Sequence, residues 1–133
     1  AGGGSAVILD ESYNANPTSM RATLAVLGSA PGARRIAVLG QMGELGPEAA
    51  AFHASLAEPV VAAGVARAIL VGEGMGALAN ALEGQVEFVH VADAAAATAA
   101  LDADLRDGDV VLVKGSNSVG LSAVVTAFSG GRE

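Results

Sequence analysis

Residues 35–39 read RIAVL, a short run of aliphatic side chains that leads into glycine and a polar loop. Four further runs of the same kind recur along the chain, at residues 6–9, 68–71, 86–91 and 110–113. Runs of this length and composition predict β-strands. Because the runs are largely continuous in apolar character, we expect strands that are buried on both faces, as in a parallel sheet.

The segments between these runs carry helical signals. Apolar residues recur at helical spacing, and caps or prolines stand at the expected starts. Pro59 should kink or divide the second of these helices. The predicted helices run from the cap Asn16 and Pro17 to Gly28, from Pro47 to Gly64, through Met75 to Leu82, from the cap Asp93 to near Leu105, and through Leu121 to Phe128.

Strands and helices alternate along the whole chain, which predicts an α/β fold: a three-layer, Rossmann-like sandwich around a mainly parallel sheet of about five strands. The 133 residues suit one domain, which we expect over residues 6–133 after a flexible lead-in at residues 1–5. In open parallel sheets, ligands bind beyond the carboxyl ends of the strands. That edge is therefore where a functional site is expected.

Composition narrows the possible partners. Fourteen acidic and seven basic side chains give a net charge of −7, which disfavours nucleic acid and anionic membrane surfaces as partners. The chain has no cysteine, which excludes disulfides and thiol chemistry, and it has no signal peptide or membrane-spanning run, so we expect a cytoplasmic protein. Aromatic residues make up only 3%, so we expect Phe52, Phe88 and Phe128 to be the few large side chains of the interior.

Three loops at the predicted carboxyl ends are rich in glycine and polar residues. They cover residues 10–17, 40–47 and 114–120. The first reads DESYNANP, and a purely structural interpretation explains Asn16 as a helix cap but leaves Asp10, Tyr13 and Asn14 without a role.

The last loop reads KGSNSVG and begins with Lys114, the only lysine of the chain. An ammonium group beside a helix amino terminus is suited to binding an anion. Alternatively, Ser118 caps the helix and Lys114 pairs with an acid. The residues alone leave both interpretations open.

In the middle loop, Glu44 and Glu48 could hold a cation or a ligand amine. The structural interpretation is favoured: Glu48 is an acid near a helix start, and His53 is a partly exposed surface residue. His53 and His90 lack a third ligand at metal spacing, so no metal site is predicted.

A competing signal lies at Gly72, Gly74 and Ala77, which fit the G-x-G-x-x-G/A dinucleotide fingerprint, with Asp93 about 20 residues on. It follows the third predicted strand instead of the first, which makes it the weaker hypothesis. A stand-alone dinucleotide-binding module is the alternative function, and a domain that serves mainly to pack against partners is a third. The chain contains no GxxxxGK[ST] phosphate-binding loop.

Four segments together resemble a known family. DESYNANPTSMRATLAVL (residues 10–27), RRIAVLGQMGELGPE (34–48) with the following His53, AILVGEGM (68–75) and VVLVKGSNSVGL (110–121) are similar, in order and spacing, to the carboxy-terminal domain of Mur ligases, in the version that adds D-alanyl-D-alanine. The resemblance covers nearly the whole chain. Its most specific element is SYNANP, because sister Mur ligases carry a tyrosine-histidine-proline version of that loop.

The resemblance implies one domain of a three-domain, ATP-dependent ligase of peptidoglycan precursor synthesis. In that family, MgATP phosphorylates the tripeptide carboxyl group of UDP-N-acetylmuramoyl-tripeptide, and the D-alanyl-D-alanine amine then attacks the acyl phosphate. ATP and Mg²⁺ are held mainly by the central domain, and an amino-terminal domain binds the uridine nucleotide. The carboxy-terminal domain closes over ATP and positions the dipeptide, so this chain alone should be inactive and should carry no catalytic residue.

The resemblance also implies site residues and a strand order. The five strands should follow the order 1-5-2-3-4, and an antiparallel strand that precedes the segment starting at Ala6 is missing. Gln41 replaces an acid common in the family, and Asn117 replaces an arginine. The residues expected near the nucleotide and reaction centre are Asp10, Tyr13, Asn14 and Asn16. Those expected near the peptide substrates are Lys114, Ser116, Asn117 and Ser118.

Overall fold

The computed structural model describes residues 7–11, 17–29, 34–40, 46–104 and 109–114. Strands and helices alternate in these residues, as the sequence predicts. In chain order the elements are β1 (Val7–Glu11), α1 (Pro17–Ser29), β2 (Arg34–Gly40), the 3-10 turn η1 (Gly46–Glu48), α2 (Ala49–Ala54), α3 (Ala57–Ala62), β3 (Arg67–Val71), the 3-10 turn η2 (Glu73–Met75), α4 (Gly76–Leu82), β4 (Glu87–Val91), α5 (Ala94–Asp104) and β5 (Asp109–Lys114).

The strands form one sheet in the order β1-β5-β2-β3-β4, and all four pairings are parallel. This is the order that the family resemblance implies. β5 lies between β1 and β2, so that Val111 is the register partner of both Ile8 and Ile36. A strand with a neighbour on each side and helices over both faces has no contact with water, which explains its unbroken apolar run.

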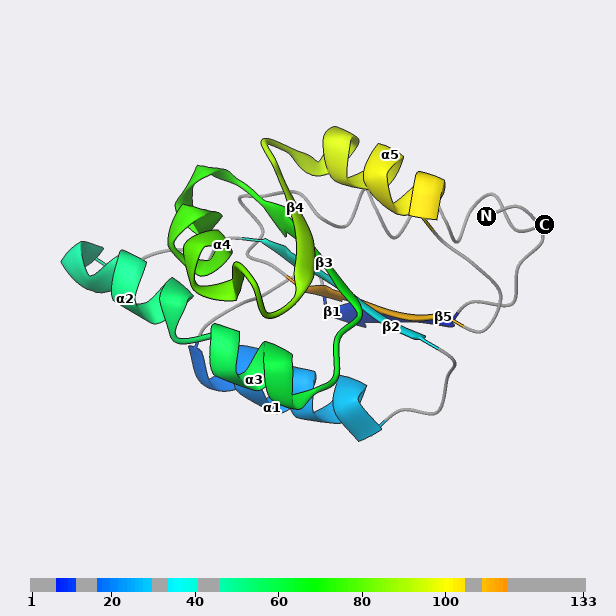
Figure 1. The fold of residues 1–133 in the computed structure, drawn as a ribbon, viewed down its shortest axis with the longest axis horizontal. Helices are drawn as coiled ribbons and strands as arrows, with labels where there is room; N and C mark the ends of the chain where they lie inside the picture. Colours follow the sequence, from blue (N-terminus) through cyan, green and yellow to red (C-terminus); the bar gives the residue numbers. More distant parts are fainter. Residues whose placement is uncertain (1–6, 12–16, 30–33, 41–45, 105–108, 115–133) are drawn as a thin grey trace.

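Helices cover both faces of the sheet, which confirms the predicted three-layer α/β fold (Figure 1). α1, α3 and α4 pack on one face, and α5 lies on the other. Both cores consist of aliphatic side chains. The larger core includes Met20, Leu24 and Leu27 of α1, Leu56 and Val60 around α3, and Leu78 and Leu82 of α4; the smaller joins Ala97 and Leu101 of α5 to Ile36, Ile69 and Val111 of the strands.

The second predicted helix is divided, as Pro59 led us to expect, but the division lies before the proline. α2 ends at Ala54 and α3 begins at Ala57, and the Leu56 amide donates to the His53 carbonyl at 3.1 Å in a tightened turn. Pro59 then occupies the first turn of α3, where a missing N–H costs nothing. The chain thus places its proline where a helix tolerates one.

α1 and α3 approach closely because α1 carries a glycine at their contact. A Cβ atom added to Gly28 would lie 3.0 Å from the Cα and 3.3 Å from the Cβ of Ala63. A contact this close to the backbone of the neighbouring helix is unusually tight, so a side chain here would push that backbone away by a few tenths of an ångström. The small residues that dominate the composition are therefore needed for helix packing here.

Two neighbouring side chains on α2 contradict the sequence predictions. His53, expected to be partly exposed, is 2% exposed, whereas Phe52, expected in the interior, is 37% exposed. The buried residues His53, Leu56, Ala57 and Val60 follow the i, i+3, i+4, i+7 helical repeat, and Phe52 lies off that stripe. Burying a phenylalanine side chain stabilises a fold by about 1.5–3 kcal/mol, so this arrangement forgoes a sizeable gain.

The remaining predictions concern the other phenylalanines and the chain ends. Phe88 is half-buried and packs against the larger core, in agreement with the prediction. Phe128, the predicted helix over residues 121–128 and the lead-in at residues 1–5 lie outside the described residues. In the described part of the chain, every helix is too short or too polar to cross a membrane.

An ion pair joins the amino-terminal ends of the neighbouring strands β2 and β5. Arg34 and Asp109 are register partners on β2 and β5, and the guanidinium donates to both carboxylate oxygens, at 3.1 Å from Nε and 2.8 Å from Nη2. Asp109 is 2% exposed. On the next pair of strands, Arg67 and Glu87 form a looser pair at 3.8 Å, in which Glu87 is 83% exposed. Bidentate geometry and burial make the first pair the stronger of the two.

We expect Asp109→Asn to lower the free energy of unfolding by about 1–3 kcal/mol, because the neutral amide cannot match a buried, two-point contact with Arg34. The matched control is Glu87→Gln, which makes the same isosteric change on the exposed pair and should cost less than about 0.5 kcal/mol. Urea unfolding of both variants measures the difference. Equal effects would show that burial does not distinguish the two pairs.

We also expect Gly28→Val to destabilise the domain by about 2–3 kcal/mol, because the added atoms collide with the backbone of Ala63. Ala25→Val, on an exposed position of the same helix, reports the cost of a β-branched residue alone, which is about 0.6 kcal/mol. Thermal and urea unfolding would compare them. If Gly28→Val matched the control, the close approach of α1 and α3 would not require glycine.

Candidate functional site

The carboxyl ends of β1, β5 and β2 lie side by side at one edge of the sheet. The register pairs Glu11 of β1 and Leu39 of β2 with the same residue of β5, Lys114. The three polar loops of the sequence follow these three strand ends directly. Parallel pairing thus brings together the starts of loops that are separated by up to about a hundred positions in the chain.

Lys114 is the last residue of β5 and is 2% exposed. Burying an unpaired ammonium group is unfavourable, and Lys114 as a residue is not without an interaction. Its backbone is paired on both sides, so β1 and β2 hold its position as well as its own strand does. The only lysine of the chain is therefore held rigidly at the centre of the edge where ligands of parallel sheets bind.

Of the other predicted site residues, only Asp10 lies in the described part of the chain. It belongs to β1, paired with Val113, and not to the following loop as predicted. β1 extends to Glu11 because its backbone stays paired with β5 as far as Lys114. Outside the described residues lie Tyr13, Asn14, Asn16, Ser116, Asn117 and Ser118, as do Gln41 and Glu44.

α2 begins close to this edge, after the segment that leads from the carboxyl end of β2. Glu48 is exposed in η1 at the amino terminus of α2, which is where the structural interpretation put it, and its side chain makes no capping hydrogen bond. His53 is buried below, in a helix that packs against η2 and α4. In the described residues, histidines and acids form no group suited to holding a metal ion.

The glycine-rich turn after β3 has a structural use. Gly72 adopts φ +105°, a conformation that favours glycine, and its carbonyl oxygen lies 2.7 Å from Nε2 of His90 on β4. Asp93 accepts a hydrogen bond from the Ala96 amide at 2.9 Å and so caps α5, as predicted. Both the glycine and the acid of the dinucleotide fingerprint therefore have local roles.

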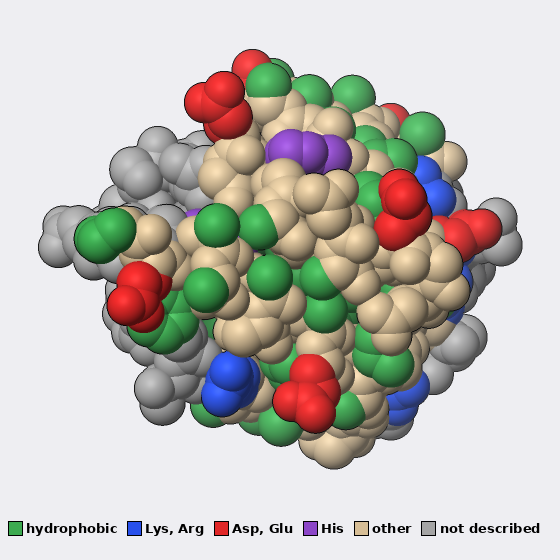
Figure 2. All heavy atoms as spheres, turned by 60° about the vertical axis from the view of Figure 1, so that its left-hand side comes forward, with side chains coloured by type: hydrophobic (Ala, Val, Ile, Leu, Met, Phe, Trp, Pro, Cys, Tyr) green, Lys and Arg blue, Asp and Glu red, His purple; other side chains and the backbone are tan. Residues whose placement is uncertain are grey.

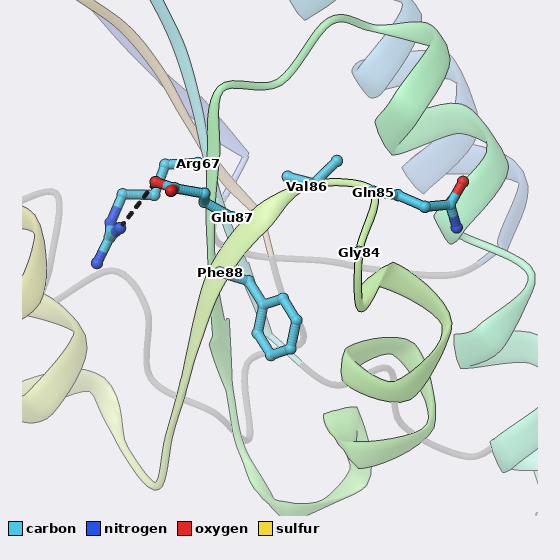
Figure 3. Close-up of a pocket in the computed structure, with 6 residues that line it drawn as sticks. All are labelled: Arg67, Gly84, Gln85, Val86, Glu87 and Phe88. Atoms are coloured by element: carbon cyan, nitrogen blue, oxygen red, sulfur yellow. Dashed lines mark ion pairs between the residues drawn. The ribbon is translucent and has the colours of Figure 1, made fainter.

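Hollows among the described residues also lie away from the three strand ends. One, of about 550 Å³, lies near the amino-terminal start of β3 and β4, and Figure 3 shows Arg67, Gly84, Gln85, Val86, Glu87 and Phe88 around it. Arg67 and Glu87 pair there, so its two charges offset each other. Another, beside Glu73, His90, Val91 and Ala92, lies at the carboxyl end of β4. Neither was anticipated from the sequence, because no motif marks it.

The surface carries no concentrated charge on the face drawn in Figure 2, where acidic side chains are spread singly among apolar and polar ones. Such a distribution gives no strong local field for steering a charged macromolecule. Lys114 differs from these surface charges because it is buried at the carboxyl end of β5.

A comparison with known protein families identifies residues 2–117 as a Mur ligase glutamate ligase domain. The chain belongs to the Mur ligase family. The matched region includes all twelve described elements, and with them the carboxyl ends of β1, β5 and β2. The Mur ligase assignment thus rests on the same segments that form the sheet and its carboxyl edge.

Curated relatives are Mur ligases named UDP-N-acetylmuramoyl-tripeptide–D-alanyl-D-alanine ligase. The protein of Mycobacterium bovis is 42% identical over 95% of this chain, that of Synechocystis is 43% identical over 90%, and that of Escherichia coli is 41% identical over 92%. The chain spans 29%, 27% and 26% of these relatives, respectively. It therefore corresponds to less than a third of each.

Solved Mur ligase structures share the fold. MurF from Thermotoga maritima, in complex with ADP, has a TM-score of 0.74 at 26% identity, with 92% of this chain and 28% of that one covered. MurF from Acinetobacter baumannii has a TM-score of 0.80 at 24% identity, with 93% and 28% covered, and this likeness concerns the fold alone. The three-layer arrangement around a parallel sheet is thus that of MurF.

We expect Asp93→Ala to destabilise the chain by about 1 kcal/mol, the usual loss for a helix cap, as measured by urea unfolding. NADH should produce no binding heat with either the wild-type chain or this variant. Saturable NADH binding that Asp93→Ala or Gly74→Asp abolished would instead support the dinucleotide interpretation.

Proposed function

We propose that this chain is the carboxy-terminal domain of an ATP-dependent ligase that joins D-alanyl-D-alanine to UDP-N-acetylmuramoyl-tripeptide in the cytoplasm, during peptidoglycan precursor synthesis. The observation that carries the proposal is the meeting of β1, β5 and β2 at one edge with Lys114 at its centre. The names of relatives that are 41–43% identical over nearly the whole chain support the same reaction. Nothing comparable favours the dinucleotide-binding module.

The reaction requires a carboxyl group to be activated before an amine can attack it. Phosphoryl transfer from ATP to the tripeptide carboxylate gives an acyl phosphate and ADP, and attack by the dipeptide amine then gives the amide and releases phosphate. The tripeptide carboxylate and the acyl phosphate are anionic at the reacting end, and the dipeptide carries a carboxylate at the end opposite its reacting amine. A buried ammonium such as that of Lys114 can offset such charge, for instance at the carboxylate of the dipeptide.

The domain's contribution in this proposal is positioning and the exclusion of water, not proton transfer. Asp10, Tyr13, Asn14 and Asn16 approach the nucleotide and reaction centre, while Lys114, Ser116, Asn117 and Ser118 lie near the peptide substrates. Closure of this edge over the remaining domains converts a bimolecular attack into one between held partners. It also protects the acyl phosphate from hydrolysis.

ATP and Mg²⁺ are assigned mainly to the central domain of the full-length ligase. The chain lacks a GxxxxGK[ST] loop, and its described residues offer no cluster of acids and histidines that suits a metal ion. No step of the reaction is therefore attributed to a metal held by this chain. The MurF structure from Thermotoga maritima contains ADP, which agrees with a nucleotide-dependent family.

A domain exchange tests the proposal directly. In the Escherichia coli relative, this chain replaces the matching 26% of the sequence, and the release of ADP and the mass of the peptide product are measured with all three substrates. We expect ligation that depends on D-alanyl-D-alanine. A chimaera that folds and binds ATP but forms no amide product would contradict the assignment.

Within the same chimaera, we expect Lys114→Met to lower kcat/KM for D-alanyl-D-alanine about 10- to 100-fold, the equivalent of one lost charge-assisted hydrogen bond of about 1.5–3 kcal/mol. Methionine keeps the apolar stem of the side chain and removes its charge. Arg21→Met is the matched control, because it removes one positive charge from an exposed position of α1. Wild-type kinetics in Lys114→Met would refute the role of Lys114 and leave the domain assignment standing.

A further inference from the structure

A hollow of about 460 Å³ lies at the carboxyl end of β4, and its described lining residues are Glu73, His90, Val91 and Ala92. All strand pairings are parallel, so this hollow and Lys114 belong to the same edge of the sheet. The register runs from Gly40 through Val71 to Val91, one residue beyond the level of Lys114. Ligands of parallel sheets bind at this edge, and the proposed function leaves the hollow without a use.

The imidazole of His90 is positioned by contacts on two sides. Its Nε2 lies 2.7 Å from the carbonyl oxygen of Gly72, and a Cβ atom added to Gly76 would lie 3.9 Å from its Cε1. Because a carbonyl oxygen can only accept a hydrogen bond, Nε2 carries a proton and donates it. In the neutral ring, Nδ1 is then an acceptor. The histidine therefore offers a ligand an acceptor and not a donor.

Glu73 supplies a negative charge to the same hollow. It is exposed on the 3-10 turn η2, directly after Gly72. An ionised carboxylate accepts hydrogen bonds and donates none. Val91 and Ala92 add aliphatic side chains to the lining. The hollow thus combines hydrogen-bond acceptors, a negative charge and some apolar surface.

The surrounding part of the chain also favours a positively charged ligand. Residues 46–104 contain eight acidic residues and only one arginine or lysine, Arg67. Arg67 begins β3 and therefore lies at the opposite end of the sheet from the hollow. The local potential should be negative, which disfavours a phosphate or carboxylate here and favours a cation.

A primary ammonium group on an aliphatic stem matches these features. It carries one positive charge, donates up to three hydrogen bonds, and brings methylene groups that can pack on apolar side chains. A metal ion matches less well, because the described residues contain no group of three or more acids and histidines that could hold one.

The separation from Lys114 indicates a source for such a group. Three strand spacings lie between β5 and β4, which amounts to about 14 Å. The proposed reaction joins a dipeptide to the third residue of the tripeptide, and three extended residues span about 10 Å. If Lys114 binds the dipeptide carboxylate, a long side chain on that third residue can cover the rest of the separation.

We propose that Glu73 and His90 form a subsite for a primary ammonium group, and that its occupant is the side-chain ammonium of the third residue of the tripeptide. This is the residue whose carboxyl group reacts. The inference rests on the proposed function and makes the hollow a determinant of specificity. Glu73 supplies the charge, and His90 supplies a hydrogen-bond acceptor.

NMR titration of the 133-residue chain with n-butylammonium, at constant ionic strength, tests the subsite without ligation. We expect saturable chemical-shift changes confined to residues 72–76 and 90–93, and weaker binding of 1-butanol, which lacks the charge. Glu73→Gln should weaken n-butylammonium binding about three- to fivefold, the range of an exposed charge pair. Glu83→Gln, the same change at an exposed position after α4, should leave the affinity unchanged. Shifts that spread over acidic residues of the whole chain would overturn the subsite.

His90→Phe separates the two parts of the subsite, because it keeps a ring at this position and removes the acceptor. We expect it to weaken n-butylammonium binding about as much as Glu73→Gln does. An unchanged affinity in a folded His90→Phe variant would overturn the role given to His90.

Ligation by the chimaera with the Escherichia coli relative tests the occupant. Two tripeptide substrates are compared, one ending in lysine and one in norleucine, which lacks only the ammonium group. We expect the ratio of their kcat/KM values, lysine over norleucine, to fall about three- to fivefold in Glu73→Gln and in Ala92→Met, which fills the hollow. The ratio should be unchanged in Glu83→Gln.

The two proposals fail in different ways. If the unsubstituted chimaera makes no product, the proposed function fails, while the NMR titration still decides whether the hollow binds an ammonium group. If the chimaera ligates but the lysine-to-norleucine ratio is the same in Glu73→Gln and Ala92→Met as in the wild type, the tripeptide is not the occupant and the inference is overturned. Binding of free n-butylammonium in that case would mark a site for an amine from another source.

Discussion

The pairing of β5 between β1 and β2 is the constraint on which the rest of the structure depends. It joins residues 7–11 to residues 110–114, close to the two ends of the described chain, and gives β5 backbone partners on both sides. The sheet is incomplete until these distant segments meet, so loop closure over most of the chain precedes the gain from burial. The ion pair of Arg34 with Asp109 secures the amino-terminal end of this strand, and Lys114 ends it at the opposite edge.

Because the sequence is rich in small side chains, helices can pack closely enough to cover this sheet. With 3% aromatic residues, the core must be closed by bringing helices near the strands, and Gly28 against Ala63 shows how near two of those helices come to each other. Dense packing of alanine, valine and leucine achieves interior density without large rings. A rigid scaffold of this kind suits a domain whose proposed task is to present loops at a fixed edge. Binding loops are commonly positioned in this way by a rigid scaffold.

Three buried polar side chains in the described residues depart from this aliphatic rule: Asp109 at the amino-terminal end of β5, Lys114 at its carboxyl end, and His53 on α2. Lys114 and His53 are each 2% exposed, and both lie on elements that border the segments between strands and helices. Apolar residues at such positions often serve stability equally well, since a buried charge recovers its desolvation cost only when it is fully paired. The buried Lys114 makes the carboxyl edge of the sheet a stronger candidate for a functional site than the hollow beside Arg67 and Glu87, where a surface pair faces water.

The sequence by itself determined the α/β alternation, the five strand segments, the cap at Asp93 and the division of the helix that contains Pro59, because each depends on local patterns of burial and backbone chemistry. It also supplied the Mur ligase resemblance, since several segments kept a shared order and spacing. Only the tertiary structure decided that β1 extends through Asp10 to Glu11, that His53 is buried while Phe52 is exposed, and that Arg34 meets Asp109. These features arise between elements that are distant or tightly packed, where a neighbouring strand or helix overrides the preference of the residue itself.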